Sequence, residues 1–136
     1  MARILSIDYG GKRTGLAVTD PVQIIATGLE TIDSRELIPW LKKYLSVEEV
    51  ELIIIGLPKN WDESDTHGTP LVEAAIKKIQ KEFQGMPIKT VDERYSSKMA
   101  KDAMLEMGMK KKGRRDKKNV DVIAATIILQ EYLGRL

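Results

Sequence analysis

The sequence predicts an α/β fold, a five-stranded mixed sheet flanked by helices, whose first three strands are antiparallel and whose later strands are parallel. Three strand-like segments with short connections come first, which is typical of an antiparallel meander. Helical and strand-like segments then alternate, which is typical of parallel strands joined by right-handed crossovers. The chain has 136 residues, and this length predicts one domain spanning 1–136.

The three predicted meander strands are each apolar and bounded by turn residues. The first, Ile4–Ile7, ends at Asp8 and is followed by a turn that contains Gly10 and Gly11. Paired glycines supply the backbone conformations that tight turns require. The second strand covers 14–19 and the third covers about 25–32. We therefore expect the second strand to return antiparallel to the first.

Helix caps and apolar spacing place the elements that follow. Ser34 is the predicted N-cap of a helix that runs to about Leu45. The run Leu52–Ile55 is wholly apolar, which is typical of a parallel central strand buried on both faces. Thr69 and Pro70 open a second helix. Its predicted apolar stripe consists of Leu71, Ala74, Ala75, Ile76 and Ile79.

Three further elements complete the predicted order. A strand covers 87–91, a helix capped by Ser96 runs to Gly108, and a last helix covers about 120–133. The apolar side of the last helix holds Val120, Ile123, Ala124, Ile127, Ile128 and Leu129. Its 3.6-residue period predicts that Ile123, Ile127 and Ile128 face the sheet while Gln130, Glu131 and Arg135 face water.

The composition excludes several classes of site. The chain has no cysteine, so disulfides, thiolate metal sites and a cysteine nucleophile are excluded. Its single histidine, His67, excludes a histidine-rich metal cage and disfavours a Ser-His-Asp hydrolase. No apolar run approaches the roughly 18 residues of a membrane span, and no signal-peptide cleavage site follows Met1. We therefore expect a cytoplasmic protein with no membrane partner.

Three acidic residues are predicted to meet at one edge of the sheet. Asp8 ends the first strand, Glu93 follows the last strand, and Asp121 lies in the first turn of the last helix. Functional groups in open α/β sheets gather beyond the carboxyl ends of the strands. Three clustered carboxylates repel one another unless protons or cations neutralise them. Ligands that are all oxygen select Mg²⁺ or Mn²⁺.

Each acid also has an ordinary structural explanation. Asp8 precedes a glycine-containing turn, Asp121 would be favoured near a helix N-terminus, and Glu93 has Arg94 and Lys98 as neighbouring partners. Taken singly, each acid is more often structural. Their shared place at one edge favours a metal site.

Four motifs in this chain resemble those of the YqgF/RuvX family of ribonuclease H-like nucleases. They are the segment 7–17 (Ile-Asp-Tyr-Gly-Gly-Lys-Arg-Thr-Gly-Leu-Ala), the segment 55–60 (Ile-Gly-Leu-Pro-Lys-Asn), the segment 92–97 (Asp-Glu-Arg-Tyr-Ser-Ser), and Asp121 with the helix that follows it. The resemblance covers essentially the whole chain. It implies a ribonuclease H-like fold in which Asp8, Glu93 and Asp121 form the acidic triad of a metal-dependent phosphodiesterase. The implied role is processing of the small-subunit ribosomal RNA precursor, and the family was also proposed to resolve Holliday junctions. Related resolvases carry a further acid one helical turn after the last Asp, where this sequence has Ala124.

Basic and glycine residues near these acids are the predicted nucleic-acid contacts. At the first turn they are Gly10, Lys12 and Arg13, and beside Glu93 there is Arg94. The segment 110–118 carries seven cations and one acid, and its predicted contacts are Lys111, Lys112, Arg114, Arg115 and Lys117. A dense run of like charges beside the acids favours a polyanion as partner. A plain turn at the glycines and a solvated basic loop are the alternatives.

Two other functions are consistent with parts of the sequence. The segment 8–17 also resembles the first phosphate motif of actin-like ATPases, but 136 residues are too few for the two domains that close around a nucleotide in those proteins. A non-catalytic RNA-binding factor in ribosome assembly or transcription would use the basic segment equally well. Three acids facing a polyanion favour the nuclease over the binding factor. RNA is the favoured substrate and DNA the alternative, and the oligomeric state is left open.

Overall fold

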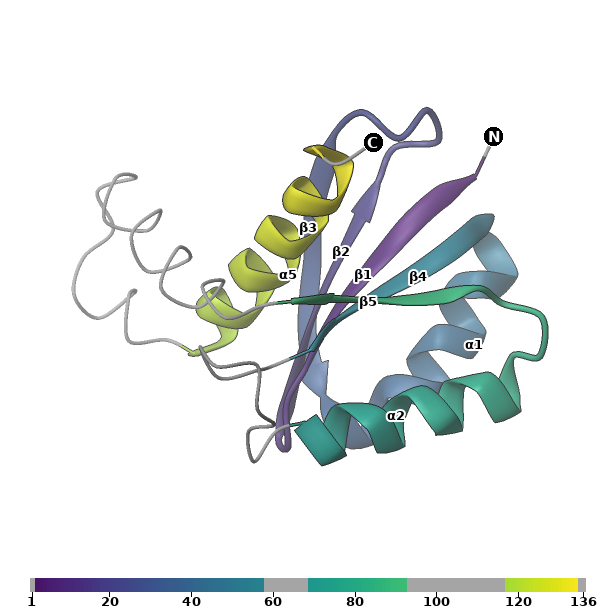
Figure 1. Ribbon diagram of the computed structural model, residues 1–136, viewed down its shortest axis with the longest axis vertical. Coiled ribbons are helices and arrows are strands. Elements are labelled where there is room, and N and C mark those ends of the chain that lie inside the picture. The colour runs from purple at the N-terminus through teal and green to yellow at the C-terminus, as the bar shows by residue number, and fades with distance from the viewer. Residues whose placement is uncertain (1, 58–68, 93–116, 135–136) are drawn as a thin grey trace.

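The computed structural model describes residues 2–57, 69–92 and 117–134, and five strands in these ranges form one sheet (Figure 1). The strands are β1 (Arg3–Tyr9), β2 (Arg13–Thr19), β3 (Ala26–Asp33), β4 (Val50–Leu57) and β5 (Ile88–Asp92). Their order across the sheet is β3-β2-β1-β4-β5. β2 pairs antiparallel with both β1 and β3, whereas β4 pairs parallel with β1 and β5. The predicted mixed sheet is therefore confirmed.

The parallel strands end at a common edge of the sheet, which we call the carboxyl edge. It is formed by the ends of β1, β4 and β5 at Tyr9, Leu57 and Asp92. The register places Ile7 of β1 beside Ile55 of β4, and Leu57 of β4 beside Asp92 of β5. Asp8, the penultimate residue of β1, therefore lies at this edge, as the sequence predicts.

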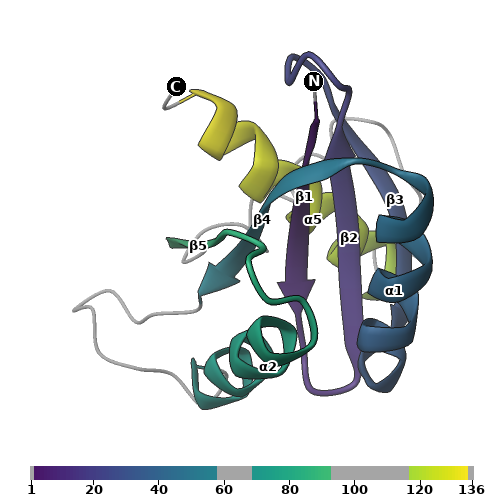
Figure 2. The same ribbon diagram turned by 90° about the vertical axis from the view of Figure 1, so that its right-hand side faces the viewer.

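Helices cover both faces of the sheet (Figure 2). One face carries α1 (Leu37–Val47) and α2 (Thr69–Glu82), and the opposite face carries α5 (Lys117–Gly134). Side chains alternate along each strand, so each strand contributes to two apolar clusters. The cluster toward α1 and α2 includes Leu5, Ile7, Leu16, Leu41, Ile53, Ile55, Val72 and Ile79. The cluster toward α5 includes Ile4, Ala17, Ile54, Val91, Ala125, Ile128 and Leu129.

The cap predicted at Ser34 is wrong by one residue. Asp33 is the cap, because its carboxylate accepts a hydrogen bond from the Arg35 backbone N–H at 2.9 Å. A short 3-10 helix, η1 (Ser34–Glu36), then precedes α1. Ser34 is buried, and its hydroxyl donates a hydrogen bond to the Gly10 carbonyl oxygen. Because the hydroxyl makes this tertiary contact, it does not cap the helix.

The apolar face of α2 is rotated from its predicted position. Thr69, Val72, Ala75 and Ile79 are the buried residues, whereas Leu71 is 48% exposed and Ala74 is also exposed. Spacing of three and four residues fits either stripe, and contact with the sheet selects the one that contains Val72.

A membrane-spanning helix, which would have to be long and apolar, is not found among the helices in the described ranges.

The last helix begins three residues earlier than predicted, so Asp121 lies in its second turn. Ile128 packs against the sheet as predicted, but Ile127 and Ile123 do not belong to that cluster. They form a separate apolar group with Ala124 and Val120 on another side of α5. Gln130 is exposed and Glu131 is half-buried. Arg135 and the predicted helix 96–108 lie outside the described residues.

Candidate active site

The side chain of Asp8 belongs to the α5 side of the sheet. Two residues earlier on β1, the buried Ser6 hydroxyl donates a hydrogen bond to the carbonyl oxygen of Ala125 in α5 at 2.8 Å. Residues two apart on a strand point to the same face. Asp8 also pairs across the antiparallel ladder with Gly15, which lies directly under α5. Asp8 is therefore on the sheet face that α5 covers, at the carboxyl edge.

Asp121 is brought to the same place by a close contact between α5 and β2. A Cβ added to Gly15 would lie 2.1 Å from the carbonyl oxygen of Asp121 and 2.4 Å from its carbonyl carbon. Only glycine leaves room for the helix backbone at this distance. Directly opposed residues in an antiparallel pair have Cα atoms about 4.5–5.5 Å apart, so Asp8, Gly15 and Asp121 are neighbours in space.

A second glycine continues the contact along α5. A Cβ added to Gly28 of β3 would lie 2.6 Å from Cγ1 of Val122 and 3.2 Å from Oγ1 of Thr126. Small residues on two strands therefore let the first turns of α5 lie unusually close to the sheet. The chain direction of α5 brings its N-terminal half, which carries Asp121, over β2 and β3.

An ion pair links Asp121 to the start of β2. Nε of Arg13 lies 3.1 Å from Oδ2 of Asp121, and the two side chains are 34% and 22% exposed. The carboxylate of Asp121 therefore already faces a cation at the carboxyl edge. The sequence predicts both Arg13 and Asp121 at one site, but nothing in their spacing indicates that the two side chains contact each other.

The turn between β1 and β2 is held by its own hydrogen bonds. The Gly10 N–H donates to the Arg13 carbonyl oxygen at 3.0 Å, and a Cβ at Gly10 would lie 2.6 Å from that oxygen. The Gly10 N–H is therefore used by the turn, which needs glycine for this close approach. Lys12, in the same turn, is exposed. Contacts from this turn to a phosphate would depend on Lys12 and Arg13.

The other predicted site residues fall outside the part of the chain that the structure describes. These are Glu93, Arg94, Lys111, Lys112, Arg114 and Arg115, and for Lys117 only its backbone place as the first residue of α5 is described. Within the described ranges no group of three His, Cys, Asp or Glu residues is placed to hold a metal ion. The structure thus brings together Asp8 and Asp121, while β5 ends at Asp92, one residue before Glu93.

Sequence relatives agree with the resemblance seen in the motifs. The family model described as "RuvX: Holliday junction resolvase" matches residues 2–135. A protein of Christiangramia forsetii is 49% identical over 133 residues, which cover 98% of this chain and 98% of that protein. A protein of Bacteroides fragilis is 48% identical and covers 98% of this chain and 96% of its own length. Both are named "Putative pre-16S rRNA nuclease".

Solved structures show the fold independently of sequence. Thermus thermophilus RuvC in complex with a Holliday junction substrate matches with a TM-score of 0.56 and 14% identity, over 98% of this chain and 97% of that one. A second structure of Thermus thermophilus RuvC matches with a TM-score of 0.52. The ribonuclease H-like fold expected from the sequence is therefore confirmed.

Proposed function

This chain belongs to the RuvX family, and from that premise we propose that it is a metal-dependent nuclease that hydrolyses phosphodiester bonds in precursor 16S ribosomal RNA. The whole chain, 1–136, acts as one nuclease domain in the cytoplasm. The names of its relatives and of the family support the nuclease.

One observation carries the proposal from the structure. Asp8, at the end of a central strand, lies beside Asp121 because α5 rests on Gly15, the residue paired with Asp8. Two acidic residues held this close at the carboxyl edge repel each other unless cations neutralise them. The Arg13 guanidinium can offset at most one of the two charges, so the arrangement supports a further cation at this edge.

Glu93 is the third carboxylate of the proposed site. Val91 of β5 packs in the apolar cluster under α5. β5 ends at Asp92 at the carboxyl edge, one residue before Glu93 in the chain. This closeness in sequence to the edge that carries Asp8 supports Glu93 as the third ligand.

The side chains present fit a hard divalent cation. Asp8 and Asp121 supply only oxygen atoms, the ligands that Mg²⁺ and Mn²⁺ prefer. The guanidinium of Arg13 contacts Oδ2 of Asp121, so this carboxylate already has a cation beside it and a metal ion would share or replace that contact. A bound metal ion would activate a water molecule and stabilise the leaving oxygen. Asp8, Glu93 and Asp121 would hold it.

Arg13 and the basic residues would hold the nucleic acid. A guanidinium has five N–H donors, and the Arg13 Nε–H points to Asp121. Its other donors would contact the phosphate next to the carboxylates, with exposed Lys12 beside it. Arg94 and the segment with Lys111, Lys112, Arg114, Arg115 and Lys117 would neutralise further phosphates.

RNA is favoured over a DNA junction as the substrate. Relatives that are 47–49% identical carry the pre-16S rRNA name, whereas the RuvC structures are only 14% identical. Ala124, at the place where related resolvases carry a further acid, is fully buried with Ile127. An alanine side chain has no oxygen atom for a metal ion, so this position lacks the further acid of the related resolvases, which supports RNA over a DNA junction.

A cleavage assay tests the proposal. Wild-type protein, Asp8→Asn and Asp20→Asn are each mixed with a precursor 16S rRNA fragment, an unrelated single-stranded RNA and a four-way DNA junction, in Mg²⁺, Mn²⁺ or EDTA. Asp20→Asn removes the same charge from the opposite end of β2, where Asp20 accepts hydrogen bonds from the Ile24 and Ile25 N–H groups. We expect metal-dependent cleavage of the precursor RNA by wild type and Asp20→Asn, and none by Asp8→Asn.

The other outcomes separate the alternatives. Preferred cleavage of the DNA junction would favour a resolvase. Tight RNA binding with no cleavage by wild-type protein in any metal would favour a non-catalytic RNA-binding factor. Cleavage by Asp8→Asn at the wild-type rate would place the active site elsewhere.

A further inference from the structure

A pocket of about 140 Å³ lies at the carboxyl edge on the sheet face opposite to Asp8 and Asp121. It is enclosed by the end of β1, the β1–β2 turn, the start of α1 and the middle of α2. Tyr9, Leu37, Ile38 and Ala75 form its aromatic and apolar wall, and Arg35 and Lys78 are its cationic residues. The proposed nuclease function assigns no role to it.

The pocket and the proposed active site share the end of β1. Tyr9 directly follows Asp8, so their Cα atoms are about 3.8 Å apart, and consecutive strand residues point to opposite faces. Tyr9 packs against the apolar cluster under α1 and α2, whereas Asp8 lies on the α5 side. A polynucleotide that crosses the sheet edge at Asp8 therefore passes from the proposed active site to this pocket.

The size of the pocket restricts what it can hold. Sites for whole small-molecule ligands usually measure roughly 300–1,000 Å³, so 140 Å³ holds one flat group and not a complete metabolite. A bare phosphate would use only the cationic part of the wall, because the apolar and aromatic part offers an anion no hydrogen bonds. A nucleobase has apolar faces and polar edges, and its own phosphate would reach the cationic residues.

The two cations have different roles in this arrangement. Arg35 makes a two-pronged ion pair with Asp33, with Nη2 to Oδ2 at 2.9 Å and Nε to Oδ1 at 3.1 Å. This pair orients the guanidinium and offsets part of its charge, and the Arg35 side chain is 88% exposed, so its flat face is open for stacking. Lys78, exposed on α2, then supplies the positive charge for a phosphate.

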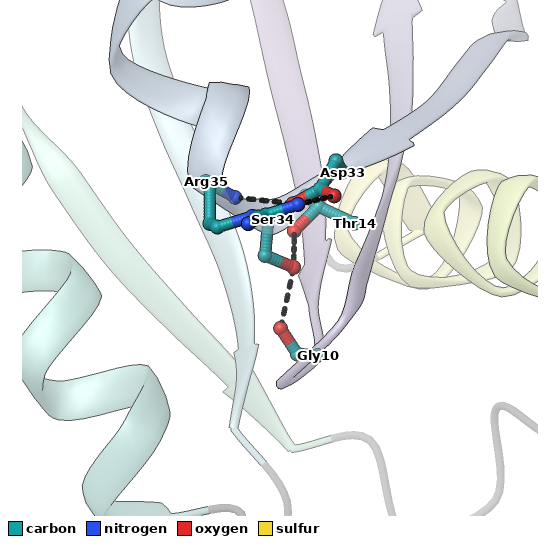
Figure 3. Close-up of polar contacts among 5 residues, drawn as sticks. All are labelled: Gly10, Thr14, Asp33, Ser34 and Arg35. Carbon is teal, nitrogen blue, oxygen red and sulfur yellow. Dashed lines mark hydrogen bonds and ion pairs between the residues drawn. The ribbon is translucent and has the colours of Figure 1, made fainter.

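Hydrogen bonds around Ser34 hold one side of the pocket before any ligand binds (Figure 3). The Ser34 hydroxyl donates to the Gly10 carbonyl oxygen at 2.5 Å and lies 2.8 Å from the Thr14 hydroxyl. The Ser34 N–H donates to the Lys12 carbonyl oxygen at 3.0 Å. These bonds join the start of η1 to the β1–β2 turn, so little ordering is required when a base enters.

We infer that this pocket binds one unpaired nucleobase of the substrate strand, next to the nucleotide that is cleaved. The base stacks against Tyr9 and the guanidinium of Arg35, and Lys78 contacts its phosphate. An unpaired base enters a recess between two helices without the cost of unpairing that a duplex would add. The inference rests on the proposed function, and it adds that the substrate is single-stranded beside the cut.

A matched pair of lysine variants tests the pocket. Lys77 and Lys78 are adjacent and exposed on α2, but only Lys78 lines the pocket. Binding of a fluorescein-labelled single-stranded RNA is measured by anisotropy in EDTA, so that no cleavage occurs. We expect Lys78→Gln to weaken binding several-fold more than Lys77→Gln. Equal weakening by the two variants would mean that Lys78 contributes only nonspecific electrostatic attraction, and it would overturn the inference.

Loss of the stack and direct mapping provide a second test. Tyr9→Leu keeps an apolar side chain against the core and should weaken binding by roughly 5- to 150-fold, the value of one base–aromatic stack. In the wild-type protein, a single-stranded hexanucleotide should shift the amide resonances of Gly11, Arg35 and Ile38, and a blunt RNA duplex of the same sequence should not. Equal shifts with the duplex, or none with the single strand, would refute the inference whether or not Tyr9→Leu folds.

These measurements separate the pocket from the nuclease. If wild-type protein fails the cleavage assay but passes these binding tests, the nuclease proposal fails and the pocket stands as a nucleic-acid site. If the protein cleaves RNA and the lysine pair behaves alike, the pocket alone is wrong.

Discussion

Replacement of Gly15 by alanine perturbs the contact that brings Asp121 beside Asp8. The added Cβ would lie 2.1 Å and 2.4 Å from the carbonyl oxygen and carbon of Asp121, and 3.0 Å from the Val122 nitrogen. All three are backbone atoms of α5, so no side-chain rotation relieves the overlap. To reach an ordinary contact of 3.4 Å, the helix backbone has to move by about 1.3 Å, the difference between 2.1 and 3.4 Å.

We expect Gly15→Ala to destabilise the fold, although a glycine-to-alanine change inside a strand usually stabilises it. Alanine is normally better than glycine inside a strand by roughly 0.5–1 kcal/mol, whereas overpacking costs about 1–3 kcal/mol. We therefore expect Gly15→Ala to lower the free energy of unfolding by at least about 1 kcal/mol. The same movement displaces Asp121 from Asp8, and a misplacement near 1 Å lowers a catalytic rate by about 10²-fold.

Urea unfolding and the cleavage assay measure the two effects on one preparation. Gly134→Ala is the control, because nothing lies within 4 Å of a Cβ built at the exposed end of α5. It should leave both stability and cleavage near wild type. If Gly15→Ala is as stable as wild type and cleaves RNA at the same rate, then α5 does not rest on β2 at Asp121 and the site geometry is wrong.

Three further predictions follow from the described contacts. Ile128→Ala should cost about 2–5 kcal/mol in urea unfolding, because Ile128 is fully buried under the sheet; a loss no larger than that of exposed Gln130→Ala would contradict this packing. The hydrogen bonds and charge of Arg35 lower the pKa of Asp33 from 3.8 to about 2, so Asp33 stabilises the fold above pH 4 and this contribution is lost as the pH falls through 2. Carbon-detected NMR should find that titration midpoint near 2 and a return toward 3.8 in Arg35→Gln; a midpoint near 3.8 in wild type would mean the pair is absent in solution. Arg13→Gln removes the cation that competes with a metal ion for Asp121. Calorimetry should therefore show tighter Mn²⁺ binding, and fluorescence anisotropy should show weaker RNA binding. Weaker Mn²⁺ binding would mean that Arg13 instead orients the carboxylate for the metal.

Local pattern was sufficient to predict the sheet. The wholly apolar run at 52–55 indicates a central parallel strand, and β4 lies between β1 and β5 with Ile53, Ile54 and Ile55 fully buried. Asp8 could be placed at the carboxyl edge because it ends the first strand. These features depend on residues close together in the chain.

Features that depend on distant residues could not be predicted. Ser34 is a good helix cap by type, yet its hydroxyl bonds to Gly10 and Thr14, and Asp33 takes the cap instead. The spacing of α5 contains two apolar sides, and only the position of the sheet shows that Ile128 faces it and Ile127 does not.

The candidate site shows the same division between local and distant information. The sequence predicts Asp8 and Asp121 as site residues, but their proximity depends on the contact of α5 with Gly15. A glycine adds nothing to the apolar periodicity, so the pattern does not indicate this contact. The pocket behind Tyr9 is built from three segments that are distant in the sequence, so no single motif points to it.

We propose that Asp8 and Asp121, together with Glu93, bind a divalent metal ion at the carboxyl edge. Substoichiometric Mn²⁺ broadens the NMR resonances of nearby nuclei, so it locates the metal without requiring any cleavage. We predict selective broadening of the amide resonances of Asp8, Gly15 and Asp121 in wild-type protein, its loss in Asp8→Asn, and its retention in Asp20→Asn. Broadening centred on other acidic residues, or unchanged broadening in Asp8→Asn, would contradict the claim.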